Sequence, residues 1–443
     1  MVAIHTPGDS QPWHAWIRDA LAGEPGVRIL DASAAADESW EFRIGRRDAE
    51  PLLLDEIASG SDDFGVTLRS RESGALLQAG RFKIHYTYRR SLDGAMREAS
   101  RWPAKAVRLI TAGMQPAAAF DPFTADAPAA ERRPSRVRFG YRLAANFLRT
   151  AFEFGLIEAR WNIGLAEEPL RPGAPLPAIR WLQTARDYFV ADPMLFENGE
   201  RAEIFCELFP YRARKGSIAA ISLEEPEAPP RIVMSGERHL SYPFVLRHDG
   251  VVYCVPEDHG ADEVALFREV AYPNEWERAG TLVRGVRALD PTLFYDGTRW
   301  WLFCTRSDRD ANLNLFAWFA ERLEGPWIEH PANPIKTDIS GARPAGNLFW
   351  ADGVLYRPSQ DCSRRYGGAL SVQRILELSP SRFREERAFR LEPLPPYYDG
   401  LHTLTTGERR FAIDGLRNRL DPSKPWRLLT AWRSRARGRR QRW

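Results

Sequence analysis

The chain has 443 residues, of which 44% are hydrophobic and 27% are charged, and its formal net charge is +3. This composition is typical of a soluble globular protein and excludes a disordered, collagen-like or disulfide-dense chain. The nearly balanced total charge gives no reason to expect nucleic-acid binding. The four cysteines lie far apart without a C-x-x-C pair, so we expect buried thiols, no metal site and no other cofactor.

The first part of the chain divides into three predicted segments. Residues 1–113 are expected to form a small α/β domain. Residues 114–136 are rich in Ala and Pro without apolar periodicity, which is typical of an inter-domain linker. Residues 137–160 predict a connecting helix. No stretch approaches the roughly 20 apolar residues that span a bilayer, and the first residues lack a secretory pattern, so we expect a cytoplasmic protein.

Residues 161–420 are dominated by an internal repeat. Five similar segments are centred on residues separated by 50, 48, 53 and 59 positions, namely Asp192, Tyr242, Asp290, Arg343 and His402. The first four units continue with an Asn-Gly or Asp-Gly turn and an aromatic-rich strand, which is a strong hairpin signal. Repeats of this length with room for four strands are typical of propeller blades. We therefore predict a mainly β fold, a five-bladed β-propeller preceded by the small α/β domain.

These five repeat positions are also the candidate functional residues. The first strand of each blade lines the central channel of a propeller, so equivalent positions should converge on one funnel. Two carboxylates, an arginine, a histidine and an aromatic ring in one concave site indicate binding or catalysis. Because a residue before proline prefers extended backbone, we expect Asp192 and Asp290 at the strand starts. The alternative is that both aspartates merely accept backbone hydrogen bonds in turns.

Several of these segments resemble known families. Ala191-Asp192-Pro193, Leu289-Asp290-Pro291 and residues 324–331 resemble the five-bladed propellers of glycoside hydrolase families 43 and 32. A closer resemblance, from about residue 161 to 415, is to the propeller domain of plant glucosamine inositolphosphorylceramide transferases and bacterial relatives. The motifs that carry it are Ser241-Tyr242-Pro243-Phe244, Ala342-Arg343-Pro344-Ala345-Gly346, Leu355–Cys362 and Gly400-Leu401-His402-Thr403.

The resemblance implies glycosyl chemistry or sugar recognition. In the hydrolase families one Asp acts as base or nucleophile and a later Asp stabilises or orients, and Asp192 and Asp290 match these positions. The family acid is a Glu, where this chain has Arg343, so Glu257 is the predicted replacement, with Glu207 as second choice. A pair of carboxylates works because one must be protonated while the other is ionised.

The remaining candidates are predicted to bind substrate. Arg343 offers a planar fork for phosphate or carboxylate, which suits a phosphorylated sugar or an activated donor. His402 either contacts sugar or water at the funnel floor or bonds a backbone carbonyl. Tyr242 either stacks on a sugar or packs between blades, as do Trp300 and Trp301. Asp361 is expected to add a polar contact from the fourth blade.

Three functions remain open at this point. The first is glycosyl transfer in glycan or glycolipid biosynthesis, with Asp192, Asp290 and Arg343 in the funnel. The second is furanosidase-like hydrolysis by Asp192, Asp290 and Glu257. The third is non-catalytic binding of a sugar or phosphosugar for a partner enzyme.

The two ends of the chain carry separate predictions. Residues 43–82 resemble the later half of a formyltransferase-type domain through Arg43-Ile44-Gly45, Gly65–Leu68 and Gly74–Phe82, which implies a degenerate accessory or docking domain. The tail, residues 421–443, has eight cations and no acid from Lys424 onward, interleaved with Trp. It predicts either contact with an anionic membrane, at the inner face, or a solvated end.

Overall fold

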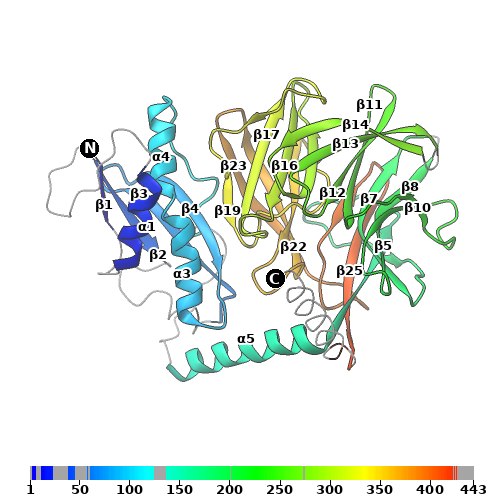
Figure 1. Ribbon diagram of the computed structural model, residues 1–443, viewed down its shortest axis with the longest axis horizontal. Coiled ribbons are helices and arrows are strands. Elements are labelled where there is room, and N and C mark those ends of the chain that lie inside the picture. Colours follow the sequence, from blue (N-terminus) through cyan, green and yellow to red (C-terminus); the bar gives the residue numbers. More distant parts are fainter. Residues whose placement is uncertain are drawn as a thin grey trace, which may run out of the picture.

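The computed structural model describes residues 2–5, 11–22, 38–44, 57, 60–123, 136–199, 201–272, 275–422, 424 and 426. Within these residues the fold is mainly β, as predicted, with a propeller arrangement of strands beside a smaller layer of helices on a sheet (Figure 1). Among the described helices, none is both long and apolar enough to cross a bilayer. Most of the basic tail, apart from residues 421, 422, 424 and 426, and residues 124–135 of the Ala/Pro-rich linker lie outside the described residues.

Four antiparallel sheets of four strands form separate blades. The first consists of β7 (Tyr188–Glu197), β8 (Ala202–Pro210), β9 (Ser217–Ser222) and β10 (Arg231–Met234). The second consists of β11 (Leu240–His248), β12 (Val251–Asp258), β13 (Glu263–Ala271) and β14 (Glu275–Arg284). Another consists of β20 (Phe349–Ala351), β21 (Val354–Asp361), β22 (Ala369–Leu378) and β23 (Phe383–Leu391).

The fourth separate blade joins the two ends of the propeller sequence. It consists of β24 (Leu404–Thr406), β25 (Phe411–Leu420), β5 (Ile157–Ala166) and β6 (Arg180–Trp181). Strands β25 and β5 pair along their whole length, from Phe411 opposite Ala166 to Leu420 opposite Ile157. This pairing between strands far apart in sequence closes the arrangement.

The prediction of five separate blades is wrong, because the unit around Asp290 is not a sheet of its own. Strands β15 (Ala288–Tyr295), β16 (Trp300–Arg306), β17 (Asn314–Ala320), β18 (Ile328–Glu329) and β19 (Lys336–Asp338) belong to a nine-stranded sheet. That sheet continues through β4 (Leu76–Lys83), β3 (Asp63–Ser70), β2 (Glu38–Ile44) and β1 (Val2–His5). The short β18 pairs only with the far end of β17, so β19 pairs with Asn314 and Leu315 and connects to β4 in parallel.

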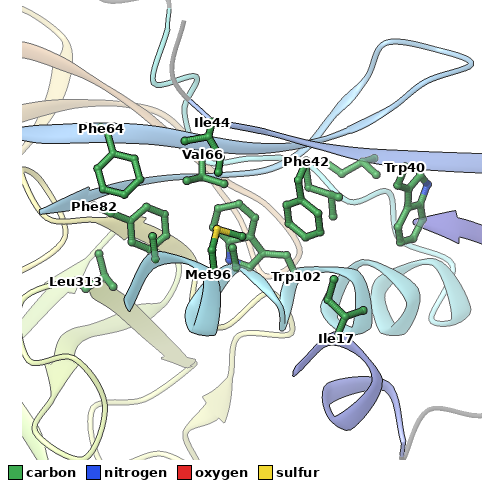
Figure 2. Close-up of a cluster of buried hydrophobic side chains, with 14 of the residues drawn as sticks. Ile17, Trp40, Phe42, Ile44, Phe64, Val66, Phe82, Met96, Trp102 and Leu313 are labelled. Atoms are coloured by element: carbon green, nitrogen blue, oxygen red, sulfur yellow. The ribbon is translucent and has the colours of Figure 1, made fainter. Parts of the chain in front are cut away.

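The N-terminal sheet packs against three helices, α1 (Gln11–Leu21), α3 (Tyr88–Ala99) and α4 (Trp102–Thr111). Helix α3 begins at Thr87, whose hydroxyl accepts the backbone N–H of Arg90. Figure 2 shows the resulting core, in which Phe42 of the sheet stacks near Trp102 of α4, with ring centroids 6.3 Å apart, and Trp40 lies beyond Phe42. Leu313 of the propeller joins the same core. Helix α5 (Arg136–Leu156) then runs from this region to β5 along one edge of the molecule (Figure 1).

The first strands of three units share an unusual backbone feature. Asp192, Tyr242 and Asp290 have φ values of 52°, 42° and 51°, and each lies where the pairing register of its strand shifts. Each is followed by proline, which has no N–H for the ladder and is accommodated by the bulge. The expectation of extended backbone at the strand starts is therefore wrong. The left-handed conformation costs on the order of 1–2 kcal/mol per residue and persists where the surroundings enforce it.

The four cysteines are all buried and free, as predicted. Trp300 and Trp301 are also buried, in the cores on either side of β16. Their rings therefore serve packing between blades rather than contact with a sugar.

Candidate functional site

The structure brings together five of the predicted residues in the middle of the propeller. The side chains of Asp192, Glu257, Asp290, Arg343 and His402 are all buried and are joined by ion pairs. We call these five residues the funnel network. It has two halves, one around His402 and one around Asp290.

His402 connects two carboxylates in the first half. Its Nδ1 makes an ion pair with Asp414, and its Nε2 lies 3.5 Å from Oδ1 of Asp192. The ring stacks on Trp161 with the two centroids 3.8 Å apart. Burial lowers the pKa of His402, but the charges of Asp414 and Asp192 outweigh burial and hold that pKa above its usual value. The imidazole is thus a candidate for proton exchange with Asp192.

Asp290 and Arg343 form the second half. The guanidinium donates to both carboxylate oxygens, with Nε 2.5 Å from Oδ2 and Nη2 3.3 Å from Oδ1. Gln360 also donates to Oδ2 of Asp290, at 2.9 Å. Burial raises the pKa of Asp290 to about 7, against the opposing charge of Arg343. Because the fork of Arg343 already binds Asp290, it is not open to a phosphate in this arrangement, and Arg343 acts as a positioning residue.

Glu257 lies beside this pair with a different electrostatic environment. Its Oε2 accepts the backbone N–H of Asp290 at 2.9 Å, and its Oε1 lies 3.9 Å from Nδ1 of His259. Burial raises the pKa of Glu257, but His259, Arg343 and the Asp290 amide together hold it below its usual value. Glu257 is therefore an ionised group, which suits a base or an electrostatic role better than an acid.

Glu207 has the opposite environment. It occupies the same position on β8 that Glu257 occupies on β12, opposite the residue that precedes the bulge. Burial first, and then the nearby charge of Asp192, raise the pKa of Glu207 well above its usual value. Burial and Asp414 likewise raise the pKa of Asp192, against the charge of His402. The funnel thus contains carboxyl groups whose pKa values are shifted in opposite directions, which is typical of acid–base sites.

Tyr242 is fully buried and contacts Asp192 through its backbone, and Thr292 and Gly346 through its hydroxyl. Its backbone N–H donates to Oδ2 of Asp192 at 3.2 Å. Its fully buried hydroxyl lies 2.8 Å from Oγ1 of Thr292 and accepts the N–H of Gly346 at 2.6 Å. Of the two alternatives that the sequence left open, the structure favours packing between blades.

Asp361 is the predicted residue that the structure places outside the network. Its carboxylate accepts the hydroxyl of Ser363 at 2.6 Å and pairs with Arg390 at 2.8 Å. The polar contact from this strand comes instead from its neighbour Gln360, because alternate residues of a strand point to opposite faces. Asp361 therefore fits a structural role.

Other functional candidates were missed from the sequence. Asp414 lies outside the aligned repeat position, and its Oδ1 accepts the backbone N–H groups of both His402 and Thr403, at 2.9 and 3.0 Å. Tyr366 covers two members of the network, since the guanidinium of Arg343 lies 4.8 Å from the centre of its ring and His402 packs on its edge. Neither residue lies in a recognisable sequence motif. The signal that could have indicated Asp414 is its charge within the otherwise apolar first half of β25.

An aromatic cavity of about 450 Å³ adjoins the His402 half. Trp161, which stacks on His402, and Tyr366, which packs on its edge, both line it. Phe189 and Phe209 stack on each other in the same lining, with centroids 4.8 Å apart. Aromatic rings that line a cavity next to a polar network are suited to contact with the apolar face of a sugar or polyol.

Asp192, His402 and Asp414 also offer ligand atoms within 4.8 Å of one another, a spacing that could hold a metal ion. The carboxylates of this group already have hydrogen-bond donors. Asp414 accepts the two backbone N–H groups described above, and Oδ1 of Asp192 accepts the hydroxyl of Thr403 at 3.0 Å. The absence of a metal site stays a prediction.

Comparison with known proteins gives a partial match. Residues 182–393 match the family described as glucosamine inositolphosphorylceramide transferase 1, N-terminal. The transferase of this name from Oryza sativa subsp. japonica is 36% identical over 205 residues, which is 44% of this chain and 27% of that protein. The one from Arabidopsis thaliana is 32% identical over 213 residues, or 46% and 28% of the two chains. This chain thus spans about a quarter of the length of the curated relatives it matches.

Solved structures include distant similarities. One is a family 43 β-xylosidase/α-arabinofuranosidase from a compost microbial metagenome, with a TM-score of 0.39 and 10% identity, covering 54% of this chain and 93% of that one. Another is an exo-β-1,3-galactanase from Phanerochaete chrysosporium, with a TM-score of 0.35 and 13% identity, covering 45% and 48%. The family match confirms the predicted resemblance to the transferase propeller domain over residues 182–393. The formyltransferase-type resemblance lies outside that range and stays a prediction.

Proposed function

We propose that this chain transfers a sugar in glycolipid biosynthesis and that the funnel network is the reacting site. The observation that carries the proposal is the set of buried carboxyl groups with opposed pKa shifts, Asp192 and Glu207 upward and Glu257 downward. The name of the matched relatives suggests an amino sugar as the transferred group and an inositol-phosphate lipid as the acceptor. We propose these two chemical classes for this chain.

Asp192 is the proposed general base. Its ionised form would take the proton of the acceptor hydroxyl while the acceptor oxygen bonds to the anomeric carbon of the donor. The leaving group of the donor departs with the electrons of the broken carbon–oxygen bond. A raised pKa makes Asp192 a stronger base near neutral pH, and His402, 3.5 Å away, can exchange the proton with it. We propose that the Asp290–Arg343 ion pair positions the groups around it.

The acceptor is proposed to bind in the aromatic cavity beside His402. Trp161, Phe189, Phe209 and Tyr366 supply apolar faces, and Arg214, Arg365 and Lys424 also line this cavity and suit a phosphate. The sequence predicted that the guanidinium of Arg343 binds the phosphate, but Asp290 already pairs with that group. We therefore assign the proposed phosphate contact to Arg214, Arg365 and Lys424.

Hydrolysis is the second candidate function, supported by one observation. Glu207 and Glu257 occupy equivalent strand positions, and their pKa values are shifted upward and downward respectively. A protonated and an ionised carboxyl at one funnel are what a glycoside hydrolase requires.

The third candidate function is binding of a sugar without catalysis. It is supported by the ion pair of Asp290 with Arg343, in which the two charges neutralise each other.

The experiment that tests the proposal measures ligand binding and turnover on three proteins. Nucleotide-activated amino sugars and phosphosugars should raise the melting temperature of the wild type. Transfer of labelled amino sugar to an inositol-phosphate lipid in mixed micelles should fall at least 100-fold in Asp192→Asn, which loses the base. Asp361→Asn, which changes a buried carboxylate outside the network, is the matched control and should retain transfer.

The outcomes separate the three functions. No thermal response to any activated or phosphorylated sugar would refute the transfer proposal. Release of free sugar from aryl furanosides, lost in Glu207→Gln, would favour hydrolysis. Binding of these sugars without turnover, with the same affinity in Asp192→Asn as in the wild type, would favour non-catalytic binding.

A further inference from the structure

Helix α5 carries a row of large apolar side chains on its solvent-exposed face. Its large exposed residues, with their exposed fractions, are Val137 (81%), Tyr141 (72%), Phe147 (56%), Leu148 (66%) and Phe152 (47%). Residues 137, 141, 148 and 152 are spaced as one stripe of an α-helix, and the small residue Ala144 on the same stripe is exposed too.

The opposite face of α5 contacts the protein through apolar and polar groups, and Phe139 and Leu143 on it pack against the N-terminal core. Arg142 is half-buried, donates to the carbonyl of Gly60 at 2.7 Å and pairs with Asp62 at 3.5 Å. Arg149, also half-buried, donates to the carbonyl of Arg364 at 3.4 Å. A surface helix of a globular protein normally exposes a polar outer face. Helix α5 instead exposes large apolar residues on its outer face, while Phe139 and Leu143 pack inward.

Two further exposed apolar residues lie near the end of the helix. The backbone N–H of Asp421 donates to the carbonyl of Leu156, the last residue of α5, at 2.8 Å. Leu420 and Trp426, at this same end, are 58% and 71% exposed. From Lys424, whose Nζ donates to the carbonyl of Ile157, the sequence carries eight cations and no acid to its end. The end of α5 thus lies beside Lys424, where the most basic segment of the sequence begins.

We propose that this surface, α5 together with Leu420 and Trp426, lies in the interface of an anionic lipid bilayer. A contiguous stripe of large apolar residues on a soluble fold marks a docking surface. A helix with an apolar outer face and cations beside it is suited to lying in the plane of the headgroups, with its aromatic rings at that depth. The adjoining basic segment favours anionic lipid, because cations gather at a negative surface.

Figure 1 shows that α5 runs along the rim of the molecule, below both the N-terminal sheet and the propeller. A docked helix would therefore hold both parts on the same side of the membrane. The aromatic cavity is lined by Ile157 and Lys424, at the end of α5, so docking would also bring that cavity to the lipid surface. The docking proposal itself does not depend on the proposed function.

Vesicle cosedimentation of the full chain tests the proposal. We expect binding to vesicles of phosphatidylcholine with about 30% phosphatidylserine and much weaker binding to phosphatidylcholine alone. The double variant Leu148→Glu with Phe152→Glu should bind at least tenfold more weakly, because two large apolar groups no longer enter the interface. The matched control is Ile232→Glu with Val270→Glu, which alters side chains 50% and 52% exposed on propeller strands β10 and β13. The control should bind like the wild type.

Two further measurements decide the remaining outcomes. The α5 double variant should keep the circular dichroism spectrum and melting temperature of the wild type, since both side chains are exposed. Unchanged vesicle binding of that variant, with binding lost instead in a chain ending at Pro422, would assign the contact to the tail alone and overturn the proposal. A wild-type dimer in light scattering that the α5 variant dissociates, without vesicle binding, would identify the face as a contact between copies and also overturn it.

Discussion

The carboxylate of Asp414 holds His402 in two ways, through an ion pair with Nδ1 and a hydrogen bond from the His402 backbone N–H at 2.9 Å. This double contact fixes the ring and directs its other nitrogen, Nε2, toward Asp192. His402 thus lies between two carboxylates, and a buried imidazole in this position can carry a proton from one group to the other.

The first prediction concerns the charge of Asp414. In Asp414→Asn the imidazolium of His402 loses the carboxylate that most favours it, so the pKa of His402 should fall. NMR titration of the His402 ring protons in both proteins measures this change. An unchanged or higher pKa in the variant would mean that Asp192 alone sets the charge state of the histidine.

The second prediction follows from the effect of His402 on Asp192. The charge of His402 lowers the pKa of Asp192 against burial, so His402→Gln should raise that pKa further. A base must be ionised to act, and the acidic limb of the pH profile for sugar transfer should therefore move to higher pH. A variant that loses activity equally at every pH would indicate a purely structural role for His402.

The third prediction concerns a buried ion cluster at the junction of the nine-stranded sheet with β23. Glu385 pairs with Lys336 at 2.7 Å and with Arg357 at 2.6 Å, and all three side chains are buried. Glu385→Ala leaves two buried cations without this partner and should lower the free energy of unfolding by about 3–5 kcal/mol. The adjacent exposed Glu386, which pairs with Arg374, is the control, and Glu386→Ala should cost less than about 1 kcal/mol in urea unfolding. Similar losses of unfolding free energy in Glu385→Ala and Glu386→Ala would contradict a stabilising role for the buried ion cluster.

The fourth prediction is a loss of stability in mild acid caused by His330. Burial lowers the pKa of His330 to about 4, and its Nε2 lies 3.1 Å from the carbonyl of Ser379 while Nδ1 accepts the N–H of Ala332. The folded state binds this proton less well than the unfolded state, whose histidine has a pKa of about 6.5. The stabilisation is therefore complete above pH 6.5 and is lost as the pH falls toward 4.

Urea unfolding at pH 7 and pH 5 measures this effect. The contribution of His330 should fall by about 2 kcal/mol between the two values, and His330→Gln should show a correspondingly smaller drop than the wild type. Equal pH dependence in the two proteins would show that His330 does not contribute.

The fifth prediction concerns Gly346, which follows the Arg343 segment. A Cβ at this position would lie 1.8 Å from the carbonyl oxygen of Leu404, and φ is +122°. Gly346→Ala should therefore lower stability by on the order of 3 kcal/mol or more, or prevent folding. Gly280→Ala is the control, since a Cβ there meets no described atom within 4 Å, and its melting temperature should stay close to that of the wild type.

The repeat in the sequence determined most of the architecture. Its steps of 48 to 59 residues, with Asp-Gly and Asn-Gly turns, place the strands and identify Asp192, Asp290, Arg343 and His402 as equivalent positions. The structure joins these residues by contacts because each lies in or shortly before the first strand of its unit, and these segments meet in the middle of the propeller. Local turn chemistry and periodicity contain this information, since they depend on neighbours in the chain.

Contacts between distant segments were decided by the tertiary structure alone. The pairing of β19 with β4, which merges the expected fifth blade with the N-terminal sheet, joins residues far apart in the sequence. The left-handed backbone of Asp192, Tyr242 and Asp290, each before a proline, opposes the local preference and exists because the surrounding sheets enforce it.

The chemistry of the site shows the same division. Residue types predicted that acids, a cation and a histidine would meet, but not which of them pair. The bond between Arg343 and Asp290 removes the fork expected to bind phosphate, and Asp414 enters as a partner of His402 from outside the repeat. Burial and neighbouring charge then set opposite pKa shifts on Glu207 and Glu257, two glutamates at equivalent strand positions. These shifts depend on three-dimensional surroundings, which no local sequence pattern specifies.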